Sequence, residues 1–514
     1  MNHNSQHKTM QLIAKGGAIT IIASIFSYGF GFLFKLLISR FLGPSEFGLF
    51  TLASMIAGFS LIISLLGVHI AVGKFVPFFL ENKKFSLLKG TLISSFQIAS
   101  LLGVILGSTI FIFSGYIADS IFHEPGLKII LQIFALMIPF YALTTLINNI
   151  FFAFKKPSYT LITGTFITKF ITLISTAIII FLGGRIFHVS IAYCISFFIA
   201  ALIGMIIIEK KLFSITCKNI ISKLNHKQLL SFSFPLVLAG ISLTAISWTD
   251  TFFVGFFENS AQVGIYTIAF SLAATLKIFF ASIGQMFYPT MSGVHAKGDY
   301  SELAKNYQNT MHWMIMLTIP FSILFLIIPS HILGIIYGSE YLAASIPLII
   351  LTFGYTFHAT LGPATHILKV FSKTKTIFWI NIFAVVINII FNIILIPLFS
   401  IVGAAIATTS TIFIRKSILF IMARREIPFS MNYKKIIHYL LALIIPVAIL
   451  LITINLFRLR FISLILLISV YLFVYLVTIF FTKALDHSDH LIINGLIKKI
   501  GLSENKFIKK YIIK

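Results

Sequence analysis

Residues 187–208 read FHVSIAYCISFFIAALIGMIII, a run that contains no Lys, Arg, Asp or Glu. A helix needs roughly 20 apolar residues to cross the hydrocarbon core of a bilayer, so this run predicts one membrane span. The apolar residues are continuous and do not alternate with polar ones, which favours a helix over a strand of a β-barrel. Similar runs recur from one end of the chain to the other.

The composition of the 514-residue chain agrees with this prediction. Hydrophobic residues make up 58% of it, charged residues only 10%, and the mean hydropathy is +1.03. A soluble domain carries about 25% charged residues, so this chain lacks the polar surface that water requires. We therefore exclude a secreted soluble enzyme, a nucleic-acid-binding domain and a disordered chain.

The predicted fold is an all-α polytopic membrane protein with about fourteen transmembrane helices. The predicted spans are about 17–39, 46–70, 90–114, 127–151, 159–182, 187–208, 231–257, 263–289, 310–336, 341–368, 377–398, 401–423, 436–456 and 461–482.

The distribution of basic residues predicts the orientation. With a cytoplasmic N-terminus, 31 of the 39 Lys and Arg fall in cytoplasmic segments and five in external loops. The other three, Lys35, Lys169 and Lys277, lie within predicted helices. Such an asymmetry is the signature of the positive-inside rule. The same asymmetry explains the net charge of +25, so this charge does not indicate nucleic-acid binding. Basic cytoplasmic loops attract anionic lipid head groups.

An internal repeat divides the chain. Residues 47–53 read FGLFTLA and residues 263–269 read VGIYTIA, an offset of 216 residues. Both copies open the second helix of a predicted six-helix block. Because six is even, the two blocks are expected to be parallel repeats, a known transporter plan with a central cavity and alternating access.

The predicted domains follow from this repeat. They are an N-terminal six-helix lobe (1–208), a basic cytoplasmic linker (209–230), a C-terminal six-helix lobe (231–425), two extra C-terminal helices (426–482) and a basic amphipathic cytoplasmic tail (483–514).

Three segments resemble a known family. They are RFLGPSEFGLF at 40–50, the stretch from Phe234-Pro235 through Asp250 and Gly255 to VGIY at 263–266, and the loop from Tyr288-Pro289 to Gly298-Asp299. Together they resemble the polysaccharide-transporter flippases of the multidrug/oligosaccharidyl-lipid/polysaccharide exporter superfamily, over roughly residues 10–425. These motifs are structural turns and not catalytic signatures, so they indicate the family better than the substrate.

The resemblance implies a flippase for cell-surface polysaccharide biosynthesis. Its substrate would be an oligosaccharide on undecaprenyl diphosphate or an archaeal dolichol equivalent, moved from the inner to the outer leaflet of the cell membrane. The implied partners are this polyprenyl-diphosphate oligosaccharide, membrane lipids, and a polysaccharide polymerase with export proteins. Na⁺ or H⁺ coupling stays open, and neither a cofactor nor a catalytic residue is expected.

Ionisable residues inside spans are the candidate site residues, because each costs about 2.5–3.5 kcal/mol at the centre of a helix. Lys277 lies near the middle of a predicted helix, among small residues that would form a cavity wall, with Gln285 close to that face. Lys169 shares its helix face with Thr165, Thr172 and Thr176. The alternative for both lysines is helix packing with interhelical hydrogen bonds.

Lys35 and Asp250 lie at matching depths of the first and seventh predicted helices. The repeat offset of 216 residues places the equivalent of Lys35 at position 251, one residue from Asp250. We therefore predict that they pair as an external gate when the outer side is closed. Lys35 is also a candidate substrate-binding residue, or a lysine that reaches the outer surface. Asp250 is alternatively a site for a coupling Na⁺ or H⁺.

Other features carry little signal. His312, His331, His358 and His366 have no Cys or carboxylate near them in the sequence to complete a metal site, so no metal is predicted. No nucleotide-binding motif is present in the sequence.

Two other functions were weighed against the flippase. A drug/cation antiporter of the same superfamily would need intramembrane carboxylates, and this chain has one, Asp250, against three intramembrane lysines. A polytopic glycosyltransferase or polymerase would need a large external loop or clustered acids. The external loops are short and their acids are scattered.

Overall fold

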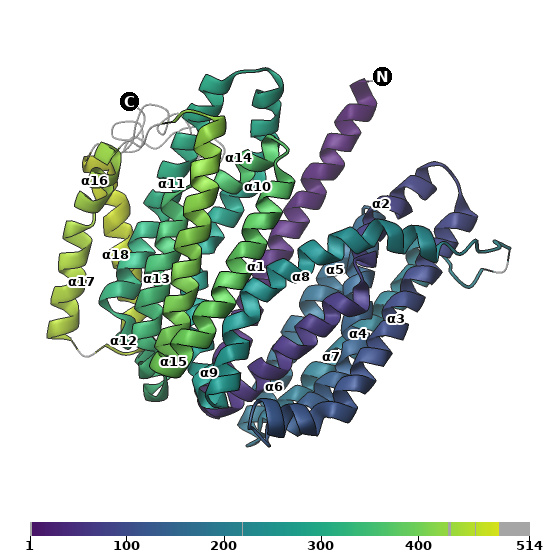
Figure 1. Cartoon of the computed structure of the whole chain (residues 1–514), viewed down its shortest axis with the longest axis horizontal. Helices are drawn as coiled ribbons and strands as arrows, with labels where there is room; N and C mark the ends of the chain where they lie inside the picture. Colours follow the sequence, from purple (N-terminus) through teal and green to yellow (C-terminus); the bar gives the residue numbers. More distant parts are fainter. Residues whose placement is uncertain (1–2, 218, 430–432, 458, 483–514) are drawn as a thin grey trace. The chain divides into compact units, whose positions relative to one another are not determined.

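The computed structural model describes the backbone of residues 3–217, 219–429, 433–457 and 459–482, without the side chains of residues 3–25 and of several positions within 235–246 and 281–286. The chain is helical throughout these ranges and contains no strand in them (Figure 1). The prediction of an all-α fold is therefore confirmed. The predicted tail, 483–514, lies outside the described residues.

The chain folds into two compact units. Unit 1 comprises Met1–Ala269 and Asn381–Thr408, and unit 2 comprises Phe270–Ile380 and Thr409–Lys514. The sequence predicts a boundary between lobes at the linker 209–230, whereas unit 1 continues past this linker to Ala269. The two six-helix lobes therefore stay a prediction.

Apart from the middle of α15 (Thr374–Glu426), the helices of unit 1 lie in the first half of the chain. They are α1 (His3–Leu65), α2 (Val68–Glu81), α3 (Phe85–Tyr116), η1 (Ile117–Ile121), α4 (Leu127–Ala153), α5 (Ser158–Thr160), η2 (Leu161–Ile171), α6 (Thr172–Phe181), α7 (Ile186–Ile207), η3 (Ile208–Leu212), α8 (His226–Phe257) and most of α9 (Ser260–Ala274).

The helices of unit 2 follow. They are α10 (Lys277–Ala296), α11 (Tyr300–Ile327), α12 (Pro329–Ile336), η4 (Ser339–Ala344), α13 (Ser345–Thr360), α14 (Ala364–Val370), the two ends of α15 (Thr374–Glu426), α16 (Tyr433–Leu441), α17 (Ile444–Leu456) and α18 (Phe461–Phe481).

Two long helices are each bent into two spans. In α1 the bend is at Gly43, whose φ of 81° is open to glycine and strained for other residues. Pro44 follows, and its fixed φ and missing N–H suit the first turn of a new helix. In α15 the bend is at Ser400, with φ 52°. The sequence prediction of separate spans on either side of each bend is confirmed.

The number of spans agrees with the prediction. Ten helices or helix runs in the described part are long and apolar enough to cross a membrane. The bends give α1 and α15 two spans each, while α8 and the α9–α10 pair are not among the ten. Counting these gives the predicted fourteen spans, so the polytopic membrane fold is confirmed.

Some predicted boundaries were wrong. The second span ends at Leu65, and α2 begins only after Gly67, which has a left-handed φ of 71°. The span predicted at 263–289 is interrupted at Thr275–Leu276, so it consists of α9 and α10. Lys277 is therefore the first residue of α10 and does not lie in the middle of a helix.

The predicted linker is attached to α3. Buried Lys89 donates hydrogen bonds from Nζ to the carbonyl oxygens of Cys217 (2.6 Å) and Ile220 (3.0 Å). Asn225, which precedes α8, donates from Nδ2 to Thr91 Oγ1 at 3.0 Å. These bonds fix the path by which the chain enters α8.

Close helix packing forms the core of unit 1. A Cβ at Gly103 would lie 2.9 Å from the Cα of Pro139, so glycine lets α3 approach α4 closely. Leu, Val, Ile and Phe side chains of α2, α3 and α4 fill the core beside this contact.

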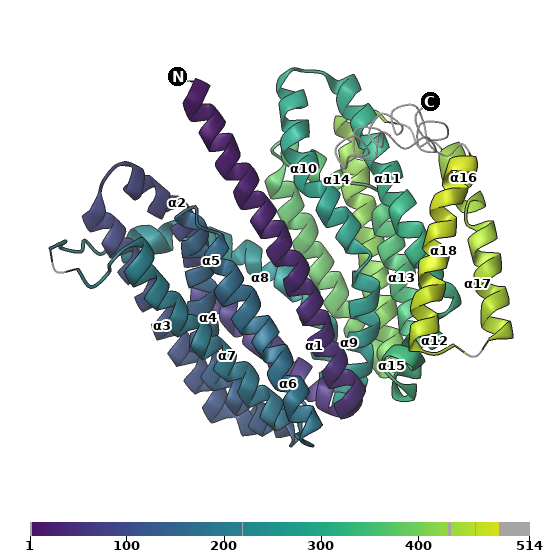
Figure 2. The same cartoon turned by 180° about the vertical axis from the view of Figure 1, so that it is seen from behind.

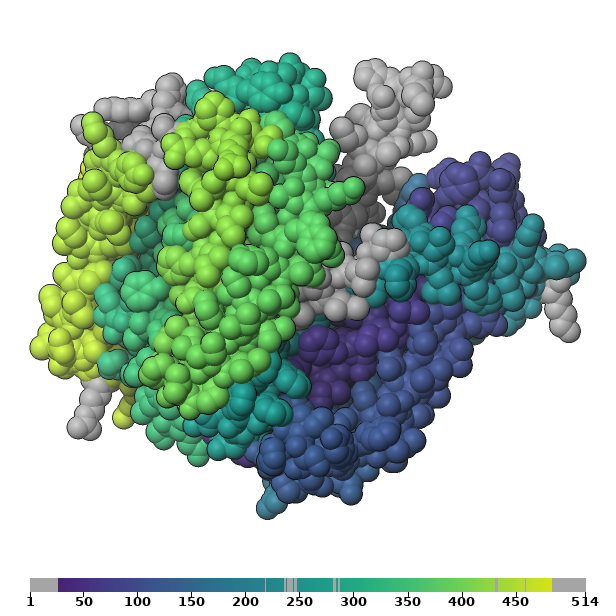
Figure 3. All heavy atoms as spheres, in the orientation of Figure 1, coloured from purple at the N-terminus to yellow at the C-terminus, as the bar shows by residue number. Residues whose placement is uncertain are grey.

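The outer faces of the helices are apolar. In α17 and α18 the exposed residues include Ile452, Leu466 and Phe473. These two helices pack on each other at one edge of unit 2 (Figures 2 and 3). An apolar exposed face of this kind suits contact with lipid tails.

Candidate functional site

Unit 1 contains a pocket with a volume of about 420 Å³. Residues of α1, α4, η2, α6, α7, α8 and α9 line it. The polar and Trp side chains in its lining are Lys35, Thr51, Ser54, Tyr141, Thr168, Lys169, Thr172, Tyr193, Thr244, Trp248 and Thr267. This volume is typical of a small-molecule site.

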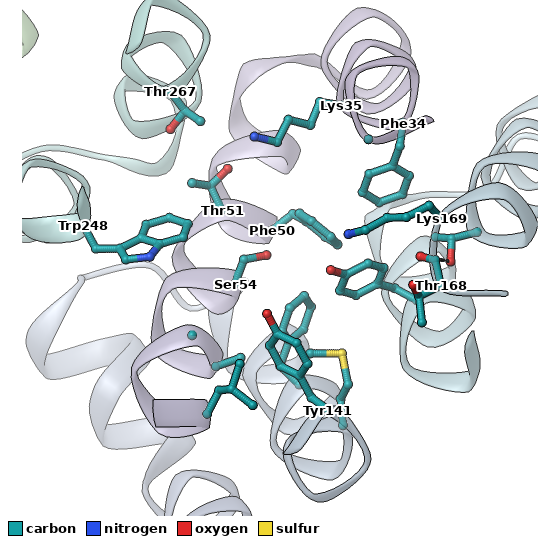
Figure 4. A pocket seen from close by; sticks show the side chains of 18 of the residues that line it. Phe34, Lys35, Phe50, Thr51, Ser54, Tyr141, Thr168, Lys169, Trp248 and Thr267 are labelled. Carbon is teal, nitrogen blue, oxygen red and sulfur yellow. Dashed lines mark hydrogen bonds between the residues drawn. The ribbon is translucent and has the colours of Figure 1, made fainter. Parts of the chain in front are cut away.

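Two lysines point into the pocket. Lys35 reaches it from the first half of α1, and Lys169 from the π-helical segment η2 (Figure 4). Wide π-helical turns occur frequently at functional sites. Both ammonium groups face the same pocket, so their like charges repel each other there. An anion between them would relieve that repulsion.

The lining contains no acidic residue. Of the residues that the structure places around the pocket, two are lysines and none is Asp or Glu. Both lysines were predicted as substrate-binding residues, and the structure brings them to one pocket. The structure places Lys169 in the pocket with Lys35.

Hydroxyl groups surround the lysines. Thr51 donates to the Phe47 carbonyl at 2.8 Å, and Thr168 donates to the Gly164 carbonyl at 2.6 Å. Because these hydroxyl hydrogens are used inside their own helices, the oxygen lone pairs are left to accept bonds from a ligand. Tyr141 and Ser54 add further hydroxyls to the same wall (Figure 4).

Aromatic rings hold the pocket in shape. Phe34 stacks on Tyr193 with ring centres 5.7 Å apart, and Phe50 contacts Tyr193 edge to face at 5.4 Å. Trp248 of α8 forms another part of the lining (Figure 4). Ring pairs of this kind pack rigidly, so the lysines are presented on a stable wall.

A second polar centre lies around Asp250, which is only 3% exposed. Tyr266 donates to its Oδ2 at 2.7 Å, and Thr408 donates to the same oxygen. Asn392 and Asn388 donate from Nδ2 to Oδ1 at 2.9 and 3.3 Å. The four partners come from α9 and from both sides of the bend in α15, all within unit 1.

Two oxygens beside this carboxylate have no hydrogen-bond partner. They are the buried Oδ1 atoms of Asn388 and Asn392. Rotation of either amide would turn an oxygen towards Asp250. The residues present can therefore provide a carboxylate, amide oxygens and hydroxyls to a small cation. Separately, no group of three or more His, Cys, Asp or Glu that could hold a metal ion occurs in the described part of the chain.

The predicted pairing of Lys35 with Asp250 is not seen in this conformation. Lys35 is not among the four hydrogen-bond partners that the structure gives Asp250. The pairing stays a prediction for another state.

Lys277 lies in unit 2, where its Nζ is 4.9 Å from the ring centre of Tyr355 and 5.6 Å from that of Phe270. The side chain of Gln285 lies outside the described residues. The proposed cavity role of both residues stays a prediction.

Comparison with known proteins assigns the family. Residues 13–295, more than half of the chain, match the family described as polysaccharide biosynthesis protein. The chain belongs to this family. Residues 235–394 also match the MatE family. The predicted membership among polysaccharide flippases of the exporter superfamily is thus confirmed.

Its relatives include proteins of Methanocaldococcus jannaschii and Haloferax volcanii. The chain is 23% identical over 418 residues to an uncharacterized membrane protein, MJ1068, of Methanocaldococcus jannaschii, covering 78% of this chain and 82% of that protein. It is 29% identical over 187 residues to the probable low-salt glycan biosynthesis flippase Agl15 of Haloferax volcanii, covering 36% of this chain and 39% of that protein.

Solved structures share the family fold. The lipid II flippase MurJ, in an inward closed conformation, is similar with a TM-score of 0.71 and 20% identity, covering 89% of this chain and 97% of MurJ. A multidrug resistance MATE family transporter in an inward-facing conformation is similar with a TM-score of 0.61 and 14% identity, covering 77% of this chain and 93% of that one. At these identities the likeness shows the fold alone.

Sequence reasoning missed two charged residues. Arg415 and Lys416 were counted with the cytoplasmic charges, but the structure places them within α15. Lys416 is buried, with 2% exposure. The available signal was their position inside the predicted span 401–423, eight and seven residues before its end.

Proposed function

We propose that this protein is a flippase that moves a lipid-diphosphate-linked oligosaccharide from the inner to the outer leaflet of the cell membrane. The observation that carries the proposal is the pocket of unit 1, in which Lys35 and Lys169 meet several hydroxyls and no carboxylate. Such a lining suits an anionic, hydroxyl-rich head group.

The chemistry of the substrate requires such a pocket. A diphosphate and a chain of sugars cannot cross hydrocarbon unaided, because burial of unpaired charges and polar groups is prohibitive. Lysine ammonium groups replace water around phosphate oxygens with charge-assisted hydrogen bonds. Threonine and tyrosine hydroxyls would bond the sugar nearest the phosphate, while the lipid tail stays in the bilayer.

The comparisons support the same function. Agl15 is named as a probable glycan biosynthesis flippase, and MurJ as a lipid II flippase. Both names describe flippases, and the cationic pocket of this chain suits an anionic glycolipid. We extend it to a polyprenyl-diphosphate oligosaccharide for this chain, with a polysaccharide polymerase and export proteins acting after it.

The proposed orientation has both termini in the cytoplasm, as the basic loops predict. With an inside-negative potential, outward movement of a negative charge is favourable by about 2.3 kcal/mol per charge per 100 mV. The membrane potential would therefore drive part of the transport by itself.

We also propose that the Asp250 centre binds the coupling ion, Na⁺ or H⁺. Its support is a buried carboxylate beside the two unpartnered amide oxygens of Asn388 and Asn392. Intramembrane carboxylates in transporters commonly bind protons or Na⁺. Binding of the ion would replace the present hydrogen bonds and so favour a different packing of α8 against α15.

The function is tested in a deletion strain. We expect lipid-linked oligosaccharides to accumulate on the inner leaflet and the wild-type gene to cure this. A Lys35→Met/Lys169→Met double variant should fail to cure it, and Lys277→Ala should also fail if the predicted cavity role of that residue holds. Lys375→Met, which changes an exposed lysine of unit 2, is the matched control and should cure it fully.

A different result would assign a different function. Absence of accumulation, together with new sensitivity to cationic drugs, would overturn the flippase and favour the drug/cation antiporter. The acid-free lining of the pocket argues against cationic substrates, because nothing in it would neutralise them.

A further inference from the structure

Trp248 of α8 presents an available indole ring to the pocket of unit 1. Its side chain lines the pocket and is only partly buried. Within the part of the chain that the structure describes, the indole has no ring partner and its N–H has no hydrogen-bond acceptor. A tryptophan N–H in an interior site normally finds a partner, so both the face and the edge of this ring are available to a molecule in the pocket.

Other aromatic residues of the lining are used within the wall. Phe50 contacts Phe134 at 5.3 Å and Tyr193 at 5.4 Å between ring centres, and Phe34 stacks on Tyr193 at 5.7 Å. Rings in such a cluster support one another. None of these contacts involves Trp248, so packing against this cluster does not explain an indole at that position.

Gly58 leaves room beside the indole N–H. It lies on the second half of α1 and also lines the pocket. A Cβ on Gly58 would be 3.7 Å from Trp248 Nε1, which is an ordinary contact distance. Because glycine has no Cβ, an acceptor of about the size of a hydroxyl oxygen can approach the N–H from this side.

Hydroxyl groups lie on the same side of the pocket. Thr51 and Thr267 are beside Trp248, and the ammonium group of Lys35 points towards them (Figure 4). Thr244 lines the pocket one helical turn before Trp248. Thr51 and Thr267 donate to carbonyl oxygens of their own helices at 2.8 and 2.7 Å, so their oxygen lone pairs can accept bonds from a ligand.

A flat apolar ring bordered by hydroxyls is complementary to a sugar. A pyranose has C–H groups on its faces and hydroxyls around its edge, and the electron-rich face of an indole attracts such polarised C–H groups. An isoprenoid chain has no hydroxyls, so it would leave the polar groups around Trp248 unpaired. The chemistry beside this ring therefore favours the sugar part of a glycolipid over its tail.

We propose that Trp248 stacks on the C–H face of the first sugar of the transported glycolipid, and that this contact lets the pocket distinguish a sugar-bearing polyprenyl diphosphate from the bare carrier. The inference rests on the proposed function and deepens it. Lys35 and Lys169 would bind the diphosphate, which both lipids share. Trp248 contacts the part that differs, with its N–H donating to a sugar oxygen beside Gly58.

The experiment compares soluble probes with and without a sugar. Full-length protein in detergent is dialysed against radiolabelled geranyl diphosphate and against geranyl diphosphate that carries glucose, galactose or N-acetylglucosamine. The wild type should bind at least one sugar-bearing probe more tightly than geranyl diphosphate. Trp248→Leu should lose this preference and keep its affinity for geranyl diphosphate. Trp379→Leu, which changes an exposed tryptophan of α15, is the matched control and should keep the preference.

Two further measurements separate sugar binding from a structural role. Gly58→Ala places a methyl group in ordinary contact with Trp248 Nε1, so the unfolding temperature should be kept while the preference for the sugar falls. In Trp313→Phe/Trp379→Phe, Trp248 is the only tryptophan of the chain. Its fluorescence emission should change more with the preferred sugar-bearing probe than with geranyl diphosphate, both at saturation.

The failure of this inference differs from the failure of the proposed function. Equal binding of all probes by the wild type, or a preference retained in Trp248→Leu, overturns the role of Trp248 alone. Weaker binding of every probe by Trp248→Leu, with a lower unfolding temperature, also overturns it and identifies Trp248 as a packing residue. If Lys35→Met/Lys169→Met binds geranyl diphosphate as the wild type does, the pocket does not bind the diphosphate, and the proposed function fails together with this inference.

Discussion

Gly48 and Gly264 contact each other in a reciprocal arrangement. A Cβ on Gly48 would meet the carbonyl oxygen of Ser260, and one on Gly264 would meet the carbonyl oxygen of Pro44. Each would also lie 3.1 to 3.2 Å from the other glycine's backbone nitrogen. Gly48 and Gly264 are 216 residues apart, and so are Pro44 and Ser260, so equivalent residues of the sequence repeat pack on each other.

We therefore expect Gly48→Ala and Gly264→Ala to destabilise the protein to a similar extent. The added methyl group meets backbone atoms that cannot rotate away, so α1 and α9 must separate. Overpacking of this kind costs about 1–3 kcal/mol. Thermal unfolding of the purified protein measures the change. Gly73→Ala, in α2, is the control, because nothing lies within 4 Å of its Cβ position.

The same contact can be locked by a disulfide. Ser45 Oγ and Ser260 Oγ are 3.1 Å apart, so Ser45→Cys and Ser260→Cys would place two sulfur atoms within reach of a bond. The native Cys194 and Cys217 are first replaced by serine. Under oxidation we expect a crosslink and the loss of most of the flipping, because a covalent bond prevents α1 and α9 from separating at this point.

Addition of dithiothreitol to the crosslinked protein should restore flipping. Each single cysteine variant should flip normally under both conditions. Full activity of the crosslinked protein would show that α1 and α9 need not separate at this point during transport.

Much of the fold could be predicted from the sequence because a bilayer constrains it strongly. Continuous apolar runs must form helices in lipid, and the Gly43-Pro44 pair marks the bend between the first two spans. The break at Thr275–Leu276 was missed, since no Pro or Gly marks it. Packing decides such a break, and the apolar pattern carries no record of it.

The candidate site was only partly predictable. Lys35 and Lys169 stood out because isolated charges in apolar runs are rare. The donors to Asp250 did not stand out, since Tyr266, Asn388, Asn392 and Thr408 are ordinary polar residues far apart in the sequence. Only the packing of α8, α9 and α15 shows that they surround one carboxylate.

Glu124, which the sequence predicts in an external loop, has a structural role. Glu124 accepts a hydrogen bond from the backbone nitrogen of Ser260 at 2.6 Å, at the first residue of α9. A carboxylate at a helix N-terminus stabilises it by about 0.3–1 kcal/mol, and more when partly buried. We expect Glu124→Ala to lower the unfolding temperature. Asp119→Asn, an exposed acid of the same segment, should leave it unchanged.

Asp250 gives the last prediction, which separates ion coupling from the gate. Asp250→Asn keeps the shape of the side chain but removes its charge, so flipping in proteoliposomes should no longer respond to an imposed Na⁺ or pH gradient.

Tyr266→Phe removes one donor to the carboxylate and should destabilise the protein by about 1–3 kcal/mol, while Tyr288→Phe, at an exposed ring, should not. Lys35→Asp combined with Asp250→Lys tests the predicted gate. If the exchange restores the flipping that each single change abolishes, the two residues pair in another state, and if it restores none, Asp250 acts through its ion alone.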